Sequence, residues 1–330
     1  MPATIAPDDI EGIVGILPTP SVPGADRWDC WDSVDLDSVA AMTERIVSGG
    51  VTLLMTCGSF GEGATLLAEE HEALTAAVSD TMAGRGLLFA GATTMNTRET
   101  IRLARRLVER GADGLFLGRP MWMSLDPAGI VRFYRDVAEA LPGVPIVVYD
   151  NAFAFKAKID TDTYRELAGI PEIVATKHIG GPTMADDLVA AEGRMAVLPL
   201  DNQWPALARA HPEARACWTG NAADGTEPLV ALAGAVAARD LDRADAIAAR
   251  MAWAQAPMFP GGRLENFVDY NIPIAHARLE GSGLVRTGPP RPPYTDAPEG
   301  HVEGGRETGR RWRQLAAELS APLPVAAGAK

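Results

Sequence analysis

Short apolar runs alternate with longer amphipathic segments eight times between about residues 12 and 238 of this 330-residue chain. In the first unit, the apolar run GIVGILPTP is followed by DLDSVAAMTERIVSGG, which has the acidic start and glycine stop of a helix. Apolar runs separated by helices are typical of parallel strands covered on both faces. Eight such units predict a closed (β/α)8 barrel, or TIM barrel. An open doubly wound sheet is the alternative, and the lack of G-x-G-x-x-G after the first strand disfavours it.

The strand pattern stops near residue 238. Three later segments have helical periodicity, at about residues 242–257, 264–283 and 304–320. The Pro-rich stretch TGPPRPPYTDAPEG predicts a loop between the last two. We therefore expect residues 1–238 to form the barrel and residues 239–330 to form a C-terminal helical extension packed on it, rather than an independent domain.

Charge and cysteine content disfavour several classes of protein. The net charge of −13 disfavours binding to nucleic acid or to an anionic membrane. The cysteines Cys30, Cys57 and Cys217 are widely spaced and form no CxxC pair, so neither a disulfide framework nor a zinc site is indicated. The N-terminus lacks a signal-peptide pattern, and no stretch approaches the roughly 18 apolar residues of a membrane span. We expect a cytoplasmic protein.

Lys177 stands at the end of an apolar strand in a chain that has only four lysines among its 30 basic residues. In a TIM barrel the carboxyl ends of the strands carry the reacting groups. A neutral lysine amine there can attack a ketone and form a Schiff base, and an apolar barrel interior favours the neutral form by lowering the pKa of lysine. The alternative is a lysine that extends along the barrel wall to water. Strand alternation places Ile173, Ala175 and Lys177 on one face and turns His178 away.

Two further strand ends could cooperate with Lys177. Tyr149 ends the preceding strand, and its hydroxyl could move protons at an imine carbon; a tyrosine that only packs is the alternative. The stretch CGSFGEG opens onto a helix, and its backbone N–H groups and the Ser59 hydroxyl could hold a carboxylate. Arg119 is a second candidate for holding a carboxylate, although an exposed loop arginine is the simpler interpretation.

These positions resemble a known family. The motifs GILPTP, GSFGE, GATTMNTRETIRLARRLVERGADGLFL and NIPIAHARLEGSGLVRTGPP, together with the tyrosine–lysine pair on successive strands, are similar to the class I pyruvate aldolases that include dihydrodipicolinate synthase and N-acetylneuraminate lyase. The resemblance implies that Lys177 is the Schiff-base lysine and Tyr149 the acid/base. It also implies a carboxylate site at Gly58, Ser59 and Phe60, a homotetramer, and a covalent lysine adduct with no metal or cofactor.

Departures from the synthase narrow the expected substrate. Ala154 replaces an arginine that holds a second carboxylate in the synthase, and Trp122 stands where the synthase has a tyrosine pair. With the insertion SVPGADRWDCWDSVDLD, these features resemble the hydratase-aldolase branch, whose members degrade polycyclic aromatic compounds. That resemblance implies an arylidene-pyruvate substrate. The implied substrate-binding residues are Gly58, Ser59, Phe60, Trp122, Trp218, Gly220 and Asn271. Simple packing is the alternative role for Trp218, and a helix N-cap is the alternative for Asn271.

Two rival functions remain open from the sequence. One is a Schiff-base aldolase or dehydratase of the same superfamily that acts on a sugar-derived 2-keto acid, which would favour polar loops over the aromatic ones present here. The other is a barrel that binds keto acids without catalysis, as a sensor or scaffold. Trapping of a lysine–pyruvate adduct by borohydride separates that second class from the enzymes.

Overall fold

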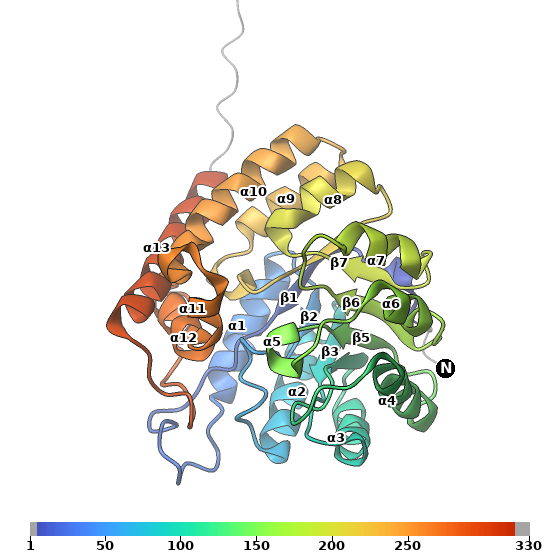
Figure 1. Ribbon diagram of the computed structural model, residues 1–330. Helices are drawn as coiled ribbons and strands as arrows, with labels where there is room; N and C mark the ends of the chain where they lie inside the picture. The colour runs from blue at the N-terminus through green and yellow to red at the C-terminus, as the bar shows by residue number, and fades with distance from the viewer. Residues whose placement is uncertain (1–4, 321–330) are drawn as a thin grey trace, which may run out of the picture.

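A computed structural model describes residues 5–320 of the chain (Figure 1). Eight parallel strands form one sheet in the order β7-β6-β5-β4-β3-β2-β1-β8. The strands are β1 (Gly12–Ile16), β2 (Leu53–Met55), β3 (Leu87–Gly91), β4 (Gly114–Leu117), β5 (Ile146–Tyr149), β6 (Ile173–Lys177), β7 (Ala196–Leu198) and β8 (Ala216–Thr219). The predicted (β/α)8 barrel is therefore confirmed, and the open doubly wound sheet is wrong.

The barrel closes between its two outermost strands, β7 and β8. No continuous ladder joins them among the described residues; instead Leu200, just after β7, forms an isolated parallel bridge with Trp218. The Trp218 N–H donates to the carbonyl of Pro199 at 2.9 Å. The sheet is thus sealed at the carboxyl ends of the strands, where the active site of a TIM barrel is expected.

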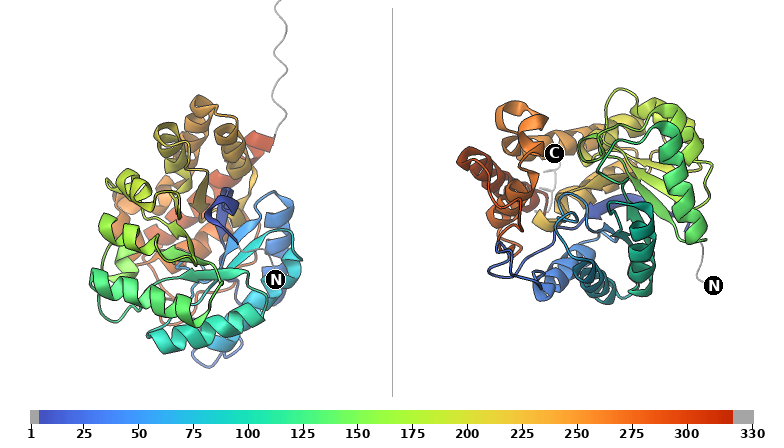
Figure 2. Two further views of the ribbon diagram at one scale, coloured as in Figure 1. Left: turned by 90° about the vertical axis from the view of Figure 1, so that its right-hand side faces the viewer. Right: turned by 60° about the horizontal axis from the view of Figure 1, so that its bottom comes forward.

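Helices surround the sheet on its outer face (Figure 2). They are α1 (Leu36–Ser48), α2 (Ala68–Met82), α3 (Thr97–Glu109), α4 (Pro127–Ala140), α6 (Thr161–Leu167), α7 (Met184–Ala191), α8 (Trp204–Ala210) and α9 (Glu227–Ala237). The short α5 (Ala152–Phe155) instead lies beyond the end of β5, where Phe155 packs in the barrel interior. Several helices begin where an acidic or amide side chain accepts a backbone N–H, which satisfies donors that the first turn leaves free. These caps are Asp35, Asn96, Asp126, Asn151 and Asp160. The short α5 was not expected from the sequence.

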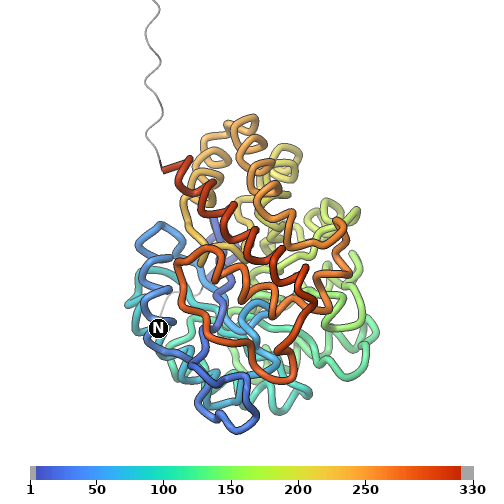
Figure 3. The backbone as a smooth tube through the Cα atoms, turned by 90° about the vertical axis from the view of Figure 1, so that its left-hand side faces the viewer, coloured from blue at the N-terminus to red at the C-terminus, as the bar shows by residue number. Residues whose placement is uncertain are grey.

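Between α9 and residue 320 the chain adds four α-helices to one side of the barrel (Figures 1 and 3). They are α10 (Leu241–Gln255), α11 (Leu264–Val268), α12 (Asn271–Ser282) and α13 (Glu299–Ser320). α10 packs on α8 and α9, and α13 lies against both α10 and α12. The boundary at residue 238 stays a prediction, but the extension does pack on the barrel. No helix within residues 5–320 is long and apolar enough to cross a membrane.

Two details differ from the expected elements. The segment 264–283 forms two helices, because Pro273 lacks a backbone N–H and fits only within the first turn of a helix, so that α12 begins just before it. The register of β6 on β5 shifts between Ile173 and Ala175. Because of this irregularity Ile173 packs in the outer core, beneath the helices, whereas Ala175 lies in the barrel interior. The expectation that Ile173 shares a face with Lys177 was wrong.

Candidate active site

A cavity of about 300 Å³ opens at the carboxyl ends of the strands. Its inner wall contains Ser59, Tyr149, Lys177 and Trp218, which follow or end β2, β5, β6 and β8. Its outer wall comes mainly from the C-terminal extension and is largely apolar. The extension contributes Gln255, Met258, Phe259, Leu264, Phe267, Val268 and Asn271. The sequence predicted an extension beside the barrel but did not reveal that it forms part of this cavity.

Lys177 is the last residue of β6 and is only 5% exposed. Its Nζ lies 3.7 Å from the ring centroid of Trp218 and 4.9 Å from that of Tyr149. Burial lowers the pKa of Lys177 to about 7, although the nearby carboxylate of Asp150 acts in the opposite direction. About half of the amine is therefore neutral at pH 7. The side chain is enclosed by aromatic rings and does not extend to water.

Tyr149 pairs with Lys177 across the β5–β6 ladder. Its hydroxyl lies 2.7 Å from the Ser59 Oγ and accepts the Ser59 backbone N–H at 3.3 Å. A third contact comes from Asn151, whose Nδ2 donates to the same hydroxyl at 3.0 Å. The ring stacks on Phe116 with a centroid distance of 4.5 Å. Tyr149 is thus both packed and hydrogen-bonded, and its hydroxyl reaches the cavity that holds Lys177.

The loop Gly58–Glu62 lies at the end of β2 and brings Ser59 and Phe60 to the cavity. Gly58 lies behind this surface, where its carbonyl accepts the N–H groups of Gly61 and Gly63 at 3.0 and 3.2 Å. These bonds fold the loop into a tight turn. A Cβ on Gly61 would approach the Leu17 carbonyl to 2.8 Å, so glycine is required at this point.

Trp218 and Gly220 lie on either side of Thr219, the last residue of β8. Trp218 is 8% exposed, and its Nε1 donates to the His178 carbonyl at 2.9 Å, so the ring both packs and lines the cavity. His178 itself is buried on the outer side, where its Nε2 lies 2.9 Å from Asp187, as strand alternation predicted. Gly220 leaves room for the Phe60 ring, which a Cβ would approach to 2.9 Å.

Asn271 lines the cavity from the first turn of α12. Its Nδ2 donates to the Val268 carbonyl at 2.7 Å, whereas its Oδ1 is buried without a partner among the described residues. The N-cap position of α12 belongs to Tyr270, so Asn271 is not an N-cap. Its amide oxygen is available to a hydroxyl or water in the cavity.

The structure does not bring Trp122 to this cavity. Trp122 is 72% exposed, and its carbonyl accepts the Nζ of Lys156 at 2.7 Å. Its neighbour Met121 packs against the barrel interior instead. The expected substrate-binding position of Trp122 is therefore corrected to a surface position.

Arg119 is neither an exposed loop arginine nor part of the cavity. It is 1% exposed, its Nη2 donates to the Ala157 carbonyl at 2.5 Å, and it forms an ion pair with Asp150 at 3.5 Å. Asp150 is fully buried and also accepts the Tyr164 hydroxyl at 2.9 Å. The carboxylate of Asp150 acts to raise the pKa of Lys177, against the effect of burial.

Sequence reasoning missed Asn151 and a row of amides. Asn151 caps α5 through its Oδ1 and holds the Tyr149 hydroxyl through its Nδ2; the N-cap signal in YDNAF could have revealed it. On the opposite side of the cavity, Gln255 donates to the Asn221 Oδ1 at 2.9 Å and accepts from the Asn202 Nδ2 at 3.1 Å. Gln203 adjoins them at the cavity wall. These neutral side chains give the outer part of the cavity hydrogen-bonding capacity without charge.

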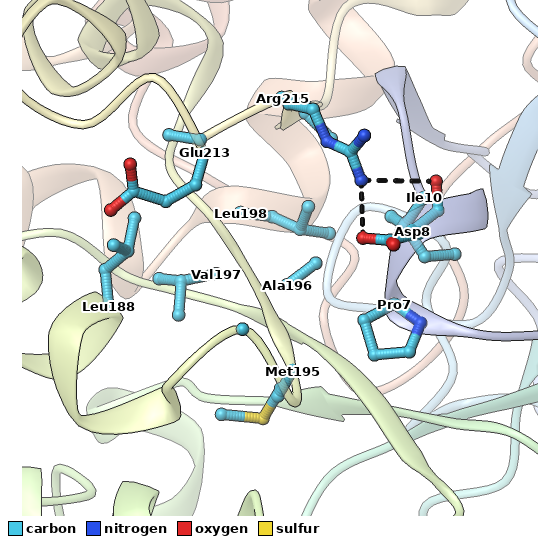
Figure 4. Close-up of a pocket in the computed structure, with 13 residues that line it drawn as sticks. Pro7, Asp8, Ile10, Leu188, Met195, Ala196, Val197, Leu198, Glu213 and Arg215 are labelled. Carbon is cyan, nitrogen blue, oxygen red and sulfur yellow. Dashed lines mark hydrogen bonds and ion pairs between the residues drawn. The ribbon is translucent and has the colours of Figure 1, made fainter.

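A second cavity, of about 310 Å³, lies at the amino-terminal ends of β7 and β8 (Figure 4). It contains the ion pair between Asp8 and Arg215, whose atoms are 2.6 Å apart and largely exposed. The rest of its lining is mainly apolar, including Ile10, Met195 and Leu198, with Glu213 as a further charged residue. It has no buried nucleophile or base, so the chemistry points to the first cavity. Within residues 5–320, no three His, Cys, Asp or Glu side chains are grouped as metal ligands.

Comparison with known proteins gives consistent matches. The model of the dihydrodipicolinate synthetase family matches residues 16–198. The trans-2'-carboxybenzalpyruvate hydratase-aldolase of Nocardioides sp. strain KP7 is 46% identical over 96% of both chains. The trans-O-hydroxybenzylidenepyruvate hydratase-aldolase of Sphingobium xenophagum is 37% identical over 96% of this chain and 97% of its own. A solved structure, PhdJ bound to a substrate intermediate, is 49% identical over 96% of this chain and 99% of its own, with a TM-score of 0.94.

Proposed function

We propose a function for this chain, which belongs to the dihydrodipicolinate synthetase family. It is a hydratase-aldolase, a lyase that adds water to an arylidene pyruvate and cleaves the product into an aromatic aldehyde and pyruvate, in the degradation of aromatic compounds. The names of its relatives support this activity. The observation that carries the proposal is the lysine amine of Lys177, enclosed by Trp218 and Tyr149 at the bottom of a mostly apolar cavity.

The first step joins the substrate to the enzyme. The carboxylate of the keto acid binds beside Ser59 and Phe60, and the neutral amine of Lys177 attacks the keto carbon. Loss of water gives an iminium ion conjugated to the carbon–carbon double bond, so the benzylic carbon becomes electrophilic. Burial supports this step because it keeps much of the amine neutral near pH 7.

Hydration and cleavage follow. A water molecule adds to the benzylic carbon and loses a proton, and the adjacent carbon gains one. In the retro-aldol step the new hydroxyl gives up its proton as the carbon–carbon bond breaks, and the electron pair moves into the iminium to form an enamine. Tyr149, hydrogen-bonded to Ser59 at 2.7 Å, transfers protons in these steps. The Oδ1 of Asn271, which has no partner among the described residues, accepts a hydrogen bond from the new hydroxyl group. Protonation of the enamine and hydrolysis release pyruvate and Lys177.

The aromatic part of the substrate occupies the outer cavity. Phe60, Phe259, Phe267 and Trp218 provide apolar walls there, which suit an aryl ring better than a polyhydroxylated chain. A sugar-derived 2-keto acid would need hydrogen-bonding partners along its whole length, whereas this cavity offers neutral amides at one side and apolar rings over much of the rest. A silent keto-acid receptor has no use for a lysine pKa near 7, so catalysis is favoured over binding alone.

Borohydride trapping tests the proposal. The protein is incubated with pyruvate and borohydride, and its intact mass is measured with Lys177→Ala as the control. We expect a stable adduct in the native chain and none in the variant; the same mass gain in both would overturn the Schiff-base mechanism. Pyruvate release is then measured with hydroxybenzylidene-, carboxybenzylidene- and hydroxynaphthyl-type pyruvates. Turnover of a sugar keto acid, with none of these three, would favour the rival aldolase.

Oligomeric state and location belong to the same proposal. We propose a cytoplasmic homotetramer, as the family resemblance implies. The three cysteines are free thiols in the structure, which is consistent with a reducing compartment. Light scattering on the purified protein measures the assembly, and a mass of one chain would contradict the tetramer.

A further inference from the structure

The Pro-rich segment after α12 contains an arginine whose burial is unusual for a loop. Arg291 lies within PPRPP and is only 2% exposed. The segment is docked against the chain that follows β1, because Ser21 donates its N–H to the Thr287 carbonyl at 2.8 Å and its hydroxyl to the Pro289 carbonyl at 2.5 Å. Gly288 has a φ of +63°, and a Cβ there would meet the Ser21 carbonyl at 2.0 Å, so only glycine permits this contact.

The guanidinium of Arg291 uses all five of its N–H groups. Nη1 donates to the Glu62 Oε1 at 2.9 Å and to the Thr19 carbonyl at 3.0 Å. Nη2 donates to the carbonyls of Pro20 and Ser33 at 3.2 and 3.1 Å, and Nε donates to the Ser33 hydroxyl at 2.6 Å. The backbone N–H of Arg291 adds a bond to the Glu62 Oε2 at 3.1 Å. A lysine could not reproduce this planar set of contacts.

Two of these partners hold the loop Gly58–Glu62 directly. The backbone N–H of Glu62 donates to the Ser59 carbonyl at 3.2 Å, and the Thr19 hydroxyl donates to the Gly61 carbonyl at 2.7 Å. Glu62 also has a φ of +53°, a strained conformation for a residue other than glycine. Such strain persists only where surrounding contacts hold the backbone in place, and Arg291 supplies several of them.

His276 on α12 supports the same carboxylate from its other side. Its Nε2 lies 2.6 Å from the Glu62 Oε1, and its Nδ1 lies 3.0 Å from the Gly288 carbonyl. Both partners are hydrogen-bond acceptors, so the ring is placed to donate toward each of them. Burial alone would raise the pKa of Glu62, but His276 and Arg291 together outweigh burial and lower it. Glu62 is therefore held as a carboxylate between Arg291 and His276.

We propose that Arg291 is a positioning residue for the keto-acid carboxylate: it holds the loop that carries Ser59 and Phe60 in its binding conformation through Glu62 and Thr19. The inference rests on the proposed function, since that function puts the carboxylate at this loop. It gives the C-terminal extension a direct part in recognition of the 2-keto acid, from a residue 229 positions away from Glu62 in the sequence.

A comparison of two ketones tests this role. Pyruvate and acetone both condense with a lysine amine, but only pyruvate has a carboxylate. For Arg291→Lys we expect the pyruvate concentration needed for half-maximal borohydride trapping to rise about 10- to 100-fold, the effect of displacing a binding group by roughly 1 Å. Trapping by acetone stays within about twofold of the native chain, and kcat changes far less than KM.

Arg45→Lys is the matched control. Arg45 also joins the barrel to the extension, by donating to the Leu284 carbonyl at 2.7 Å. Its other bond, to the Ala223 carbonyl at 3.3 Å, lies within the barrel, and no hydrogen bond joins it to the loop Gly58–Glu62. We expect the midpoint temperature of thermal unfolding to fall in this variant as it does in Arg291→Lys, but with no selective loss of pyruvate trapping. An equal loss of pyruvate and acetone trapping in Arg291→Lys, or unchanged trapping of both, would overturn the positioning role.

Thr19→Val extends the test if Arg291→Lys does not fold. Valine keeps the backbone carbonyl that Arg291 binds and removes only the hydroxyl that holds Gly61. We expect pyruvate trapping to weaken relative to acetone trapping, by a smaller factor than in Arg291→Lys. An unchanged ratio of pyruvate to acetone trapping would overturn the proposal. Absence of pyruvate trapping in the native chain would instead contradict the proposed function itself, so the two failures are distinguishable.

Discussion

The Nζ of Lys177 lies 3.7 Å from the ring centroid of Trp218, although β7 lies between their strands, β6 and β8, around the closed barrel. The indole spans the place where the barrel closes, and its Nε1 is fixed at 2.9 Å to the carbonyl of His178, the residue after Lys177. The same ring therefore seals the barrel and keeps water from the amine. This arrangement links closure of the fold to the reactivity of Lys177.

The rate of imine formation should therefore follow a group with a pKa of about 7. Only the neutral amine attacks a ketone, so the trapping rate with pyruvate rises about tenfold per pH unit below pH 7 and levels off above it. Trp218→Ala admits water to the amine, which raises the pKa of Lys177. The rising part of the pH–rate profile should therefore move to higher pH in this variant. Single-turnover trapping between pH 5.5 and 9.5 measures both profiles. If the trapping rate depends on pH in the same way in the native chain and the variant, Trp218 does not lower the pKa of Lys177.

Lys177→Met should abolish trapping and stabilise the fold. The lowered pKa means that the folded state disfavours the ammonium ion, so the native lysine destabilises the protein wherever it is charged in the unfolded chain. The cost is greatest below pH 7, where it amounts to at most about 5 kcal/mol, and it declines as the pH rises from about 7 to 10.5. Methionine has a similar shape without the charge. Denaturant unfolding at pH 6 and pH 10 should therefore show a larger gain in the free energy of unfolding at pH 6. A gain that grows with pH would contradict the prediction.

The fold and the reactive pair could be predicted from the sequence because both depend on local pattern. Apolar runs predicted all eight strands, and the ends of two neighbouring strands placed Tyr149 and Lys177 together. Alternation failed at Ile173, where the register of β6 shifts. Periodicity predicts the face of a residue within a regular strand, but it does not locate the irregularities that interrupt the strand.

The rest of the cavity depends on contacts between segments that are distant in the sequence. Arg291 reaches Glu62 across 229 positions, and Asn202 reaches Gln255 across 53. No local pattern indicates which side of a loop faces such a partner. For the same reason Trp122 was expected at the cavity, whereas the loop turns Met121 inward and leaves the tryptophan exposed.

Asn151 has two roles that one substitution can separate. Its Oδ1 caps α5, and its Nδ2 donates to the Tyr149 hydroxyl at 3.0 Å. Asn151→Asp keeps the cap, because aspartate and asparagine are comparable N-caps, but it replaces the donor with a carboxylate oxygen. We expect kcat to fall about 10- to 100-fold through the misdirected Tyr149 proton, with the free energy of unfolding within about 0.5 kcal/mol of the native value. Steady-state kinetics and denaturant unfolding on one preparation check both parts, and unchanged kcat would exclude the second role.

Gly220→Val and Trp122→Ala should have opposite consequences, because only one of these positions borders the cavity. A Cβ at position 220 would lie 2.9 Å from the Phe60 ring, so valine displaces Phe60 and disturbs the loop that carries Ser59. We expect KM for an arylidene pyruvate to rise about tenfold or more in Gly220→Val. Trp122 is 72% exposed, and its contact with Lys156 is made by its backbone carbonyl, so Trp122→Ala should leave both kcat and KM within about twofold. Initial-rate measurements on the two variants decide between the positions. A large rise of KM in Trp122→Ala would return this tryptophan to the substrate-binding surface, where the sequence had placed it.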